Sequence, residues 1–311
     1  MKPPRFSIIM NVYNGERFLR EALASVFAQT FGDWELIFWD DCSTDGSAAV
    51  LAGFPRDERV RYFLSPEQTP LAPARDEAIA RARGEWLAFL DQDDVWTADK
   101  LQKQAALIDA SASDRLAIVY GRTMMFGDVD PPQDFDHWHE FGDLPSGNIF
   151  ESLFVDSCYI CQSAACLRTE EVRRIGPVPP ELHHAHDYFL YTEIARDLEA
   201  AAVQDVVCWY RVHGGAMTPR YYRQVQLEAI RIAERWRHAL DPAVFRRRVR
   251  IQNTMIGLWQ VRSGQGMLDG LRTIARDGSV PYLLARPFAR AARALRRAVR
   301  RSPRPPRPDF A

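Results

Sequence analysis

The chain has 311 residues, of which 47% are hydrophobic and 26% charged, and its net charge at pH 7 is −1. This length and composition fit a globular protein with one large core or two domains, and the near-neutral charge argues against a nucleic-acid binder. No apolar run is long enough to span a bilayer, and the chain starts on a short strand rather than a signal-peptide core. We therefore expect a cytoplasmic protein.

The first third of the chain alternates short apolar strands with helices. Strands are predicted at residues 6–10, 35–39, 60–64 and 86–90. Helices are predicted at 16–29 and 71–83, with a short helix between them that ends at residue 51. Units of about thirty residues with this alternation are typical of a right-handed, doubly wound parallel sheet. The chain has neither Gly-x-Gly-x-x-Gly after the first strand nor Gly-x4-Gly-Lys-Ser/Thr, which disfavours a dinucleotide fold and a P-loop nucleotidase.

Three carboxylates, Asp91, Asp93 and Asp94, follow the uninterrupted apolar run 86–90. The carboxyl ends of parallel strands form the edge at which open α/β sheets bind ligands. Clustered carboxylates repel one another unless a divalent cation or a proton intervenes, and hard oxygen ligands suit Mg²⁺ or Mn²⁺. The pattern predicts a metal site, with an acidic helix-capping turn as the alternative. An EF-hand is disfavoured because the loop lacks the central Gly and the distal Glu.

The next hundred residues mix strands and helices less regularly. Helices are predicted at 97–108, 149–154, 169–175 and 188–198, strands at 116–120, 158–167 and 202–209, and a long loop at 126–146. Beyond residue 219 the pattern is helical only.

Five cysteines, an odd number, fit reduced thiols better than a disulfide framework. Cys158-x2-Cys161-x4-Cys166, followed by His183, His184 and His186, leaves zinc binding open. We favour a buried strand, in which cysteine behaves as a small hydrophobic residue.

Six separated motifs agree in order and spacing with one family. They are Ser7-Ile8-Ile9-Met10-Asn11-Val12-Tyr13-Asn14, Gln29-Thr30-Phe31, Trp39-Asp40-Asp41-Cys42-Ser43-Thr44-Asp45-Gly46, Ala74-Arg75-Asp76, Gly84-Glu85 and Leu90-Asp91-Gln92-Asp93-Asp94. Together they resemble family 2 glycosyltransferases of the GT-A fold over about residues 5–215. The resemblance implies a nucleotide-sugar-binding half at 1–115, an acceptor-binding and catalytic half at 116–219, and a helical extension at 220–311.

The resemblance also implies a nucleotide-sugar donor, commonly a UDP-sugar, bound through a divalent metal. Asp41 is then expected to bind the base, with Asn11 and Tyr13 lining its pocket, and Arg75 to meet the diphosphate. A surface charge is the alternative for Arg75, since exposed arginine is common. Asp45 is interpreted as a turn or cap residue rather than a ligand.

Within the aspartate motif, the resemblance assigns ribose and metal contacts to Asp91, Asp93 and Asp94, with Asp93 and Asp94 nearest the metal. Asp187 is the implied general base and His213, in Arg211-Val212-His213, approaches the metal or the diphosphate. The alternatives are a helix cap for Asp187 and an ordinary loop histidine for His213. The sequence departs from the family at two positions, with Asp76 where Asn is common and His186 where an acid is common.

These features predict an inverting glycosyltransferase that uses Mn²⁺ or Mg²⁺ and moves a sugar to a hydroxyl of a glycan or lipid-linked acceptor, as in surface polysaccharide synthesis. A nucleotidyltransferase is one alternative, but it needs a Gly-rich loop with Arg or Lys after the first strand, and residues 11–15 are not one. A non-catalytic protein that binds nucleotide sugars on the same scaffold is the other.

The end of the chain is strongly basic. Residues 281–311 hold nine arginines against one acid, Asp309, so this tail carries +8 and the preceding 280 residues about −9. Apolar residues recur at helical spacing between the arginines. We therefore expect 281–307 either to contact anionic lipids at the inner face of the cytoplasmic membrane or to pack on the domain or on a second subunit. Nucleic-acid binding is disfavoured, because the tail holds only three aromatic residues for base stacking.

Overall fold

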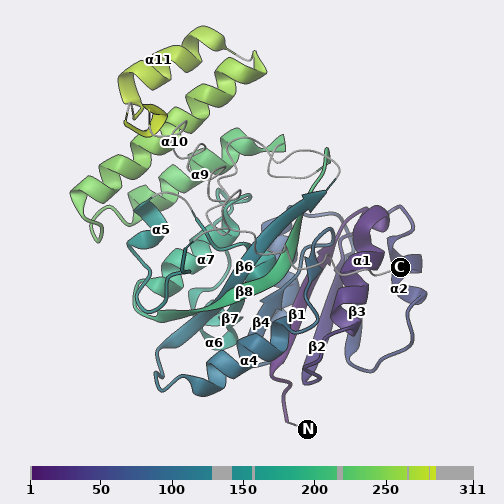
Figure 1. Cartoon of the computed structure of the whole chain (residues 1–311). Coiled ribbons are helices and arrows are strands. Elements are labelled where there is room, and N and C mark those ends of the chain that lie inside the picture. Colours follow the sequence, from purple (N-terminus) through teal and green to yellow (C-terminus); the bar gives the residue numbers. More distant parts are fainter. Residues whose placement is uncertain are drawn as a thin grey trace, which may run out of the picture. The chain divides into compact units, whose positions relative to one another are not determined.

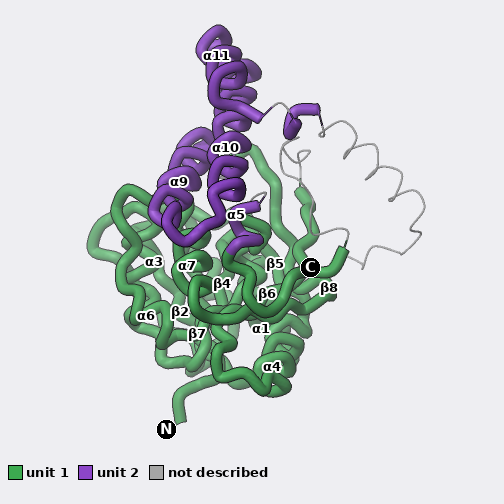
Figure 2. Tube along the Cα trace, turned by 90° about the vertical axis from the view of Figure 1, so that its left-hand side faces the viewer, with its two compact units in different colours: residues 1–150, 158–216, 308–311 green, residues 151–157, 217–307 purple. Residues whose placement is uncertain are grey.

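A computed structural model describes residues 2–127, 142–155, 158–215, 220–264, 266–279 and 281–284. Most of the predicted loop 126–146 and nearly all of the predicted basic tail 281–307 lie outside these residues. Figure 2 shows two compact units: unit 1 takes its described residues from 1–150 and 158–216, and unit 2 from 151–157 and 217–307. Both predicted halves of the glycosyltransferase domain contribute to unit 1. The predicted start of the helical extension at residue 220 lies three residues after residue 217, where unit 2 resumes.

Unit 1 is organised on one sheet, whose described strands follow the order β3-β2-β1-β4-β7-β6-β8-β5 (Figure 1). The strands are β1 Phe6–Val12, β2 Trp34–Asp40, β3 Val60–Leu64, β4 Trp86–Phe89, β5 Val95–Trp96, β6 Leu116–Gly127, β7 Cys166–Arg168 and β8 Glu199–Val212. Strands β1 to β4 pair in parallel, as do β6 and β8, whereas β7 runs antiparallel to both β4 and β6, and β5 antiparallel to β8. The predicted doubly wound, mostly parallel sheet is confirmed.

Helices accompany this sheet in unit 1 and make up the regular structure described for unit 2. Unit 1 contains α1 Glu16–Phe27, α2 Ser47–Ala52, α3 Leu71–Ala80, α4 Lys100–Ala110, α6 Thr169–Ile175, α7 His186–Ala195 and the 3-10 turn η1 Gln162–Ala164. Unit 2 contains α5 Ser152–Val155, α9 Tyr222–Arg235, α10 Pro242–Ser263 and α11 Met267–Asp277. None of the helices in the described parts of the chain combines the length and the apolarity needed to cross a bilayer.

The core of unit 1 explains why the apolar runs become strands. Alternate residues of β1, beginning with Phe6 and Ile8, belong to the same buried cluster as Leu19, Leu23 and Val26 of α1. Helix α3 also contacts β1, and every residue of β1 is buried whichever face it points to, as in other parallel sheets. All residues of β1, β2 and β4 are buried accordingly.

Gly84, in the Gly84-Glu85 motif, allows β4 to enter the sheet beside β1. A Cβ atom at this position would lie 2.5 Å from the backbone nitrogen of Ser7, which is closer than atoms can approach. The Gly84 N–H instead donates to Ser7 Oγ at 2.8 Å. The motif therefore has a packing reason that does not depend on a ligand.

Glu35 forms a buried ionic cluster at the amino ends of these strands. Its carboxylate is 2% exposed and accepts hydrogen bonds from Ser7 Oγ at 2.6 Å, from the Arg83 backbone N–H at 2.6 Å and from Arg61 Nη1 at 3.0 Å. Burial acts to raise the pKa of Glu35, but the hydrogen bonds from Ser7, Arg83 and Arg61 outweigh it and the pKa is lowered. The carboxylate is thus held ionised by partners that the chain itself supplies.

The predicted strand at 158–167 is wrong over most of its length. Only Cys166–Arg168 pairs as β7, and the residues before it form η1, with the Ala164 N–H donating to the Cys161 carbonyl at 3.0 Å. In this turn Gln162 Oε1 accepts from the buried Arg75 and Ser163 Oγ donates to the buried Asp94, each at 2.5 Å, and these polar contacts outweigh the strand preference of the apolar residues. The two-residue strand β5 was not predicted, and β6 and β8 are longer than expected.

Candidate functional site

The carboxyl ends of β1, β2 and β4 meet at one edge of the sheet, as the sequence predicts. Asn11 is in register with Trp39, the Asp41 N–H donates to the Val12 carbonyl at 2.8 Å, and the Leu90 N–H donates to the Ile9 carbonyl at 3.1 Å. The polar residues that follow each strand therefore start from neighbouring positions. This edge is the candidate site.

The loops that follow β1 and β2 are joined by hydrogen bonds. Asn14 Oδ1 accepts from the Thr44 N–H at 2.8 Å, and the Asn14 N–H donates to Ser43 Oγ at 3.1 Å. Asp45 accepts from the Glu16 N–H at 3.0 Å and from the Ser47 N–H at 3.0 Å, so it has the turn role that was predicted. The interlocked loops fix the rim of the site.

The residues predicted to bind the base have different surroundings. Asp41 is 5% exposed and accepts from the N–H and the hydroxyl of Thr69, each at 3.1 Å. Tyr13 is 41% exposed, and its backbone N–H and carbonyl pair with the Gln92 amide at 2.9 and 3.2 Å. Asn11 is 8% exposed, and its side-chain Nδ2 and Oδ1 have no hydrogen-bond partner in the described part of the chain.

Arg75 links the aspartate motif to the start of α7. It is 4% exposed, so the alternative of a surface charge is wrong. Its Nη2 donates to Asp91 Oδ1 at 2.7 Å, its Nη1 donates to Gln162 Oε1 at 2.5 Å, and Nη1 also contacts His186 Nε2. Burial and the adjacent guanidinium hold the pKa of His186 well below its usual range, so this imidazole is neutral.

Asp93 and His213 lie side by side although 120 residues separate them. His213 Nε2 and Asp93 Oδ2 are 2.8 Å apart, and Arg211 Nε donates to the Asp93 carbonyl at 2.8 Å. The His213 ring packs against Phe18, with ring centroids 4.7 Å apart. His213 is therefore held against the aspartate motif rather than free in a loop.

Asp94 bonds within unit 1. It is 1% exposed, its Oδ2 accepts from Ser163 Oγ at 2.5 Å, and its Oδ1 accepts from the Arg211 N–H at 2.9 Å. Burial, reinforced by the charge of Asp93, raises the pKa of Asp94 well above its usual value. The structure thus joins two of the three predicted metal ligands, Asp93 and His213, and gives Asp94 a separate set of contacts.

Asp187 is the second residue of α7, whose N-cap is Ala185. One carboxylate oxygen accepts from the Tyr188 N–H at 2.7 Å. Burial raises the pKa of Asp187 to about 6, against the opposing effects of the Tyr188 N–H and the Arg75 charge. A carboxyl group that titrates near neutral pH suits proton abstraction.

Four residues of the site were not found from the sequence. Thr69 orients Asp41, Gln92 orients the backbone of Tyr13, Gln162 contacts Arg75 and His186, and Ser163 holds Asp94. Gln92 carried a signal, because it lies inside the aspartate motif. The others carried none, since their partners are between 24 and 87 residues away.

The alternative zinc site at Cys158, Cys161 and Cys166 is not assembled. Cys166 Sγ lies 3.0 Å from Gln104 Oε1 and 3.7 Å from Lys100 Nζ, whereas Cys158 Sγ faces the Ile160 carbonyl at 3.7 Å. Among the described residues, the group of three or more side chains that could hold a metal combines Cys161 with Asp94 and Cys208 instead.

Residues 7–172, more than half of the chain, match the model of the family described as Glycosyl transferase family 2. The chain belongs to this family. Its relatives include the glucosyltransferase WfgD of Escherichia coli, 26% identical over 223 residues that cover 71% of this chain and 82% of WfgD. The succinoglycan biosynthesis protein ExoO of Rhizobium meliloti is 28% identical, covering 93% of this chain and 83% of ExoO.

The relative with the highest of these identities is matched over a shorter stretch. The putative teichuronic acid biosynthesis glycosyltransferase TuaG of Bacillus subtilis is 41% identical over 102 residues, which cover 32% of this family 2 chain and 40% of TuaG.

Two solved structures share the fold of the chain. TarS of S. aureus in complex with UDP-GlcNAc has a TM-score of 0.59 at 19% identity, covering 93% of this chain and 87% of that one. The mannosyltransferase PcManGT of Pyrobaculum calidifontis, in complex with GDP-Man and Mn²⁺, has a TM-score of 0.60 at 21% identity, covering 96% and 80%. The predicted GT-A fold with additional helices towards the C-terminus is confirmed.

Proposed function

We propose that this family 2 glycosyltransferase moves a sugar, with inversion, from a UDP-sugar to a hydroxyl group of a glycan or lipid-linked acceptor in surface polysaccharide synthesis. The observation that carries the proposal is the chain of contacts from Asp91 through Arg75 to His186, the residue before Asp187. These contacts connect the carboxylates at the sheet edge to the segment that carries Asp187, whose pKa is about 6.

The names of the relatives support this substrate class. WfgD is described as a glucosyltransferase from UDP-Glc to a GlcNAc-diphosphoundecaprenol acceptor, and ExoO as a succinoglycan biosynthesis protein. TarS is described in complex with UDP-GlcNAc. A UDP-sugar and a lipid-linked or polymeric acceptor are thus the reactants we test first.

The nucleotide end of the donor is assigned to Asp41, Asn11 and Tyr13. A buried carboxylate can accept the ring N–H of uracil, and Thr69 fixes the orientation of the Asp41 carboxylate for that bond. The buried Asn11 amide has no partner among the described residues, so a bound ligand would satisfy it. Exposed Tyr13 provides a ring for stacking, and Asp91 is assigned to the ribose.

A divalent ion fits Asp93 and His213. Carboxylate oxygen and imidazole nitrogen suit Mn²⁺, and Mg²⁺ is commonly held by one or two carboxylates together with substrate phosphates. When bound, the ion supplies electrostatic stabilisation of the departing diphosphate. Asp94, predicted as a further ligand, is bonded to Ser163 and the Arg211 N–H and not to His213, so we assign it to positioning the turn that carries Asp93.

Asp187 is assigned as the general base. The acceptor hydroxyl must lose its proton as it attacks the sugar, and a single displacement with inversion needs one base and no enzyme nucleophile. With a pKa of about 6, Asp187 is ionised at pH 7.5 and can receive that proton. Arg75, bonded to Asp91, Gln162 and His186, positions this carboxylate relative to the donor site and adds positive charge near the diphosphate.

The test combines nucleotide binding with turnover. Thermal shifts with UDP, GDP, dTDP and CMP, each with and without Mn²⁺, should be largest for UDP with Mn²⁺. Asp187→Asn should lower the rate of sugar transfer by about 10²- to 10⁴-fold while leaving the UDP shift unchanged. Asp197→Asn, a matched change at a side chain that is 70% exposed just after α7, should keep full activity.

Full turnover by Asp187→Asn would reject the catalytic assignment. Binding of UDP without turnover over a panel of UDP-sugars and lipid-linked acceptors would favour the non-catalytic scaffold.

A further inference from the structure

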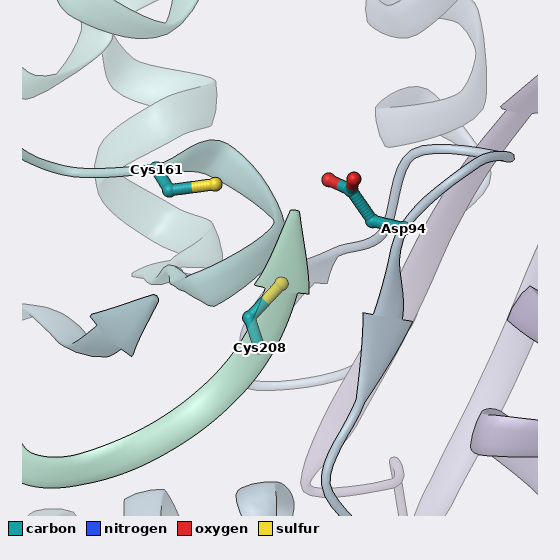
Figure 3. A group of neighbouring side chains, drawn as sticks. All are labelled: Asp94, Cys161 and Cys208. Carbon is teal, nitrogen blue, oxygen red and sulfur yellow. The ribbon is translucent and has the colours of Figure 1, made fainter. Parts of the chain in front are cut away.

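Three side chains from distant parts of the sequence converge next to the candidate site. Asp94 lies between β4 and β5, Cys161 directly precedes η1, and Cys208 belongs to β8. One carboxylate oxygen of Asp94 and the two Sγ atoms all lie within 4.8 Å of one another. Figure 3 shows Cys161 and Asp94 facing each other across a space that Cys208 enters from its strand.

The carboxylate in this group lacks a cationic partner. Asp94 is 1% exposed, and its hydrogen-bond donors among the described residues, the Ser163 hydroxyl and the Arg211 N–H, are both neutral groups. None of the described lysine or arginine side chains forms an ion pair with it. A buried charge without a counter-charge is costly, and bound cations are one means of compensating it.

The two thiols differ from the other buried cysteine of unit 1. The Cys166 thiol donates to Gln104 Oε1 and accepts from the ammonium of Lys100, so it already has two polar partners in the protein. Cys208 is fully buried and Cys161 is partly exposed, and their sulfur atoms face the carboxylate of Asp94. Two sulfurs and a carboxylate oxygen at this spacing are a metal-ligand set.

The spacing suits a small tetrahedral ion. With Zn–S distances of about 2.3 Å and Zn–O distances of about 2.0–2.2 Å, tetrahedral ligand atoms lie roughly 3.5–3.8 Å apart. Atoms that already lie within 4.8 Å of one another reach that spacing through small side-chain movements. Because Cys161 is partly exposed, an ion can enter from its side, and a water can complete the fourth position.

We propose that Asp94, Cys161 and Cys208 form a second metal site, which takes a zinc-class ion and is separate from the Asp93–His213 pair assigned to Mn²⁺ or Mg²⁺. Thiolate ligands select zinc over magnesium and manganese. An ion held there connects the turn that carries Asp93 to β8, the strand that ends next to His213. The site thereby fixes the two segments that present the ligands of the donor's metal.

The test uses the full chain, reduced and freed of metal, without donor or acceptor, so its result does not depend on the glycosyltransferase assignment. Titration with Co²⁺ should give a thiolate-to-cobalt charge-transfer absorption that saturates at a single equivalent, is displaced by Zn²⁺ and persists in excess Mg²⁺. Cys161→Ser and Cys208→Ser should each weaken or remove this absorption. Cys158→Ser, at a partly exposed cysteine outside the group, should leave it unchanged.

Alkylation gives a second readout that does not require the buried variant to fold. Zn²⁺ at ten times its Kd should slow iodoacetamide labelling of Cys161 by about tenfold, while Cys42 is labelled at the same rate with and without the ion. The proposal is overturned if Co²⁺ binding shows no thiolate absorption, if Cys161→Ser retains the wild-type absorption, or if Zn²⁺ does not protect Cys161.

Discussion

The two ends of the same parallel strands bury carboxylates in opposite electrostatic states. At the amino ends, Glu35 is surrounded by Ser7, Arg61 and Arg83, and its pKa is lowered despite burial. At the carboxyl ends, Asp94 receives hydrogen bonds from neutral groups, and burial raises its pKa. Where the chain supplies the cations, as around Glu35, the carboxylate stays ionised and holds the fold together. Where it supplies only neutral donors, as around Asp94, a proton or, at the proposed metal site, a bound ion compensates the carboxylate.

The first test of this contrast removes the charge of Asp93, at the carboxyl ends of the strands. Asp93→Asn should lower kcat/KM for sugar transfer by about 10²- to 10³-fold, because it removes a preorganised charge from the donor's metal site. Its free energy of unfolding without ligands should be equal to or above that of the wild type, because the repulsion between Asp93 and Asp94 is relieved. Initial rates with Mn²⁺ and urea unfolding measure the two effects.

Asp205→Asn, at a side chain that is 70% exposed, is the control for Asp93→Asn and should change neither quantity appreciably. Wild-type kcat/KM in Asp93→Asn would remove this residue from the proposed site.

Removing the charge of Glu35, at the amino ends of the strands, should lower the stability of the fold, in contrast to Asp93→Asn. Glu35→Gln should lower the free energy of unfolding by about 3 kcal/mol at pH 7, because it leaves buried donors and the Arg61 guanidinium without their anion. The folded-state pKa of Glu35 is depressed, so its contribution is present above 4.5, the ordinary value, and is lost as the pH falls through the lower folded value. Urea unfolding at pH 7 and at low pH should show this loss.

Glu85→Gln, at an ion pair whose carboxylate is 40% exposed, is the matched control for Glu35→Gln and should cost much less. A variant Glu35→Gln as stable as the wild type at pH 7 would contradict the structural role of this carboxylate.

The pH dependence of transfer tests the raised pKa of Asp187. A general base acts in its ionised form, so kcat/KM should be level above pH 7 and fall about tenfold per pH unit below pH 6. The profile is measured between pH 4.5 and 8 at saturating Mn²⁺, with UDP binding followed at each pH. A fall in activity that simply parallels a fall in UDP binding would assign the titration to the donor site instead.

Asp76 gives the smallest expected effect. Burial raises the pKa of Asp76 to about 6, although the Val178 N–H at 3.2 Å favours the charged form. Because the folded-state pKa is raised, the stabilisation from protonation is present below 3.8 and lost as the pH rises through 6. Asp76→Asn should therefore raise the free energy of unfolding by about 1 kcal/mol at pH 7.5 and change it little at pH 3.5.

Glu77→Gln, at a neighbouring carboxylate that is 59% exposed, is the comparison for Asp76→Asn and should lack its pH dependence. A loss of stability in Asp76→Asn at pH 7.5 would show that the ionised carboxylate is needed at this position.

Sequence alone determined the alternation of strands and helices in the first third of the chain and the edge at which Asn11, Asp41 and Asp91 meet. Both follow from local rules: an apolar run without polar alternation becomes a strand covered on both faces, and parallel strands end at one edge. The motifs along this edge also identified the family before any contact was known.

The tertiary structure alone decided which partners surround these residues. Gln162, Ser163 and Cys161 lie in a segment that its apolar composition presented as a strand, whereas η1 turns them towards Arg75 and Asp94. No local pattern encodes such contacts, because the partners of Ser163 and Gln162 lie 69 and 87 positions away and are brought close only by the packing of the whole unit. Local sequence therefore specified where the carboxylates are, and the fold specified which of them the chain neutralises.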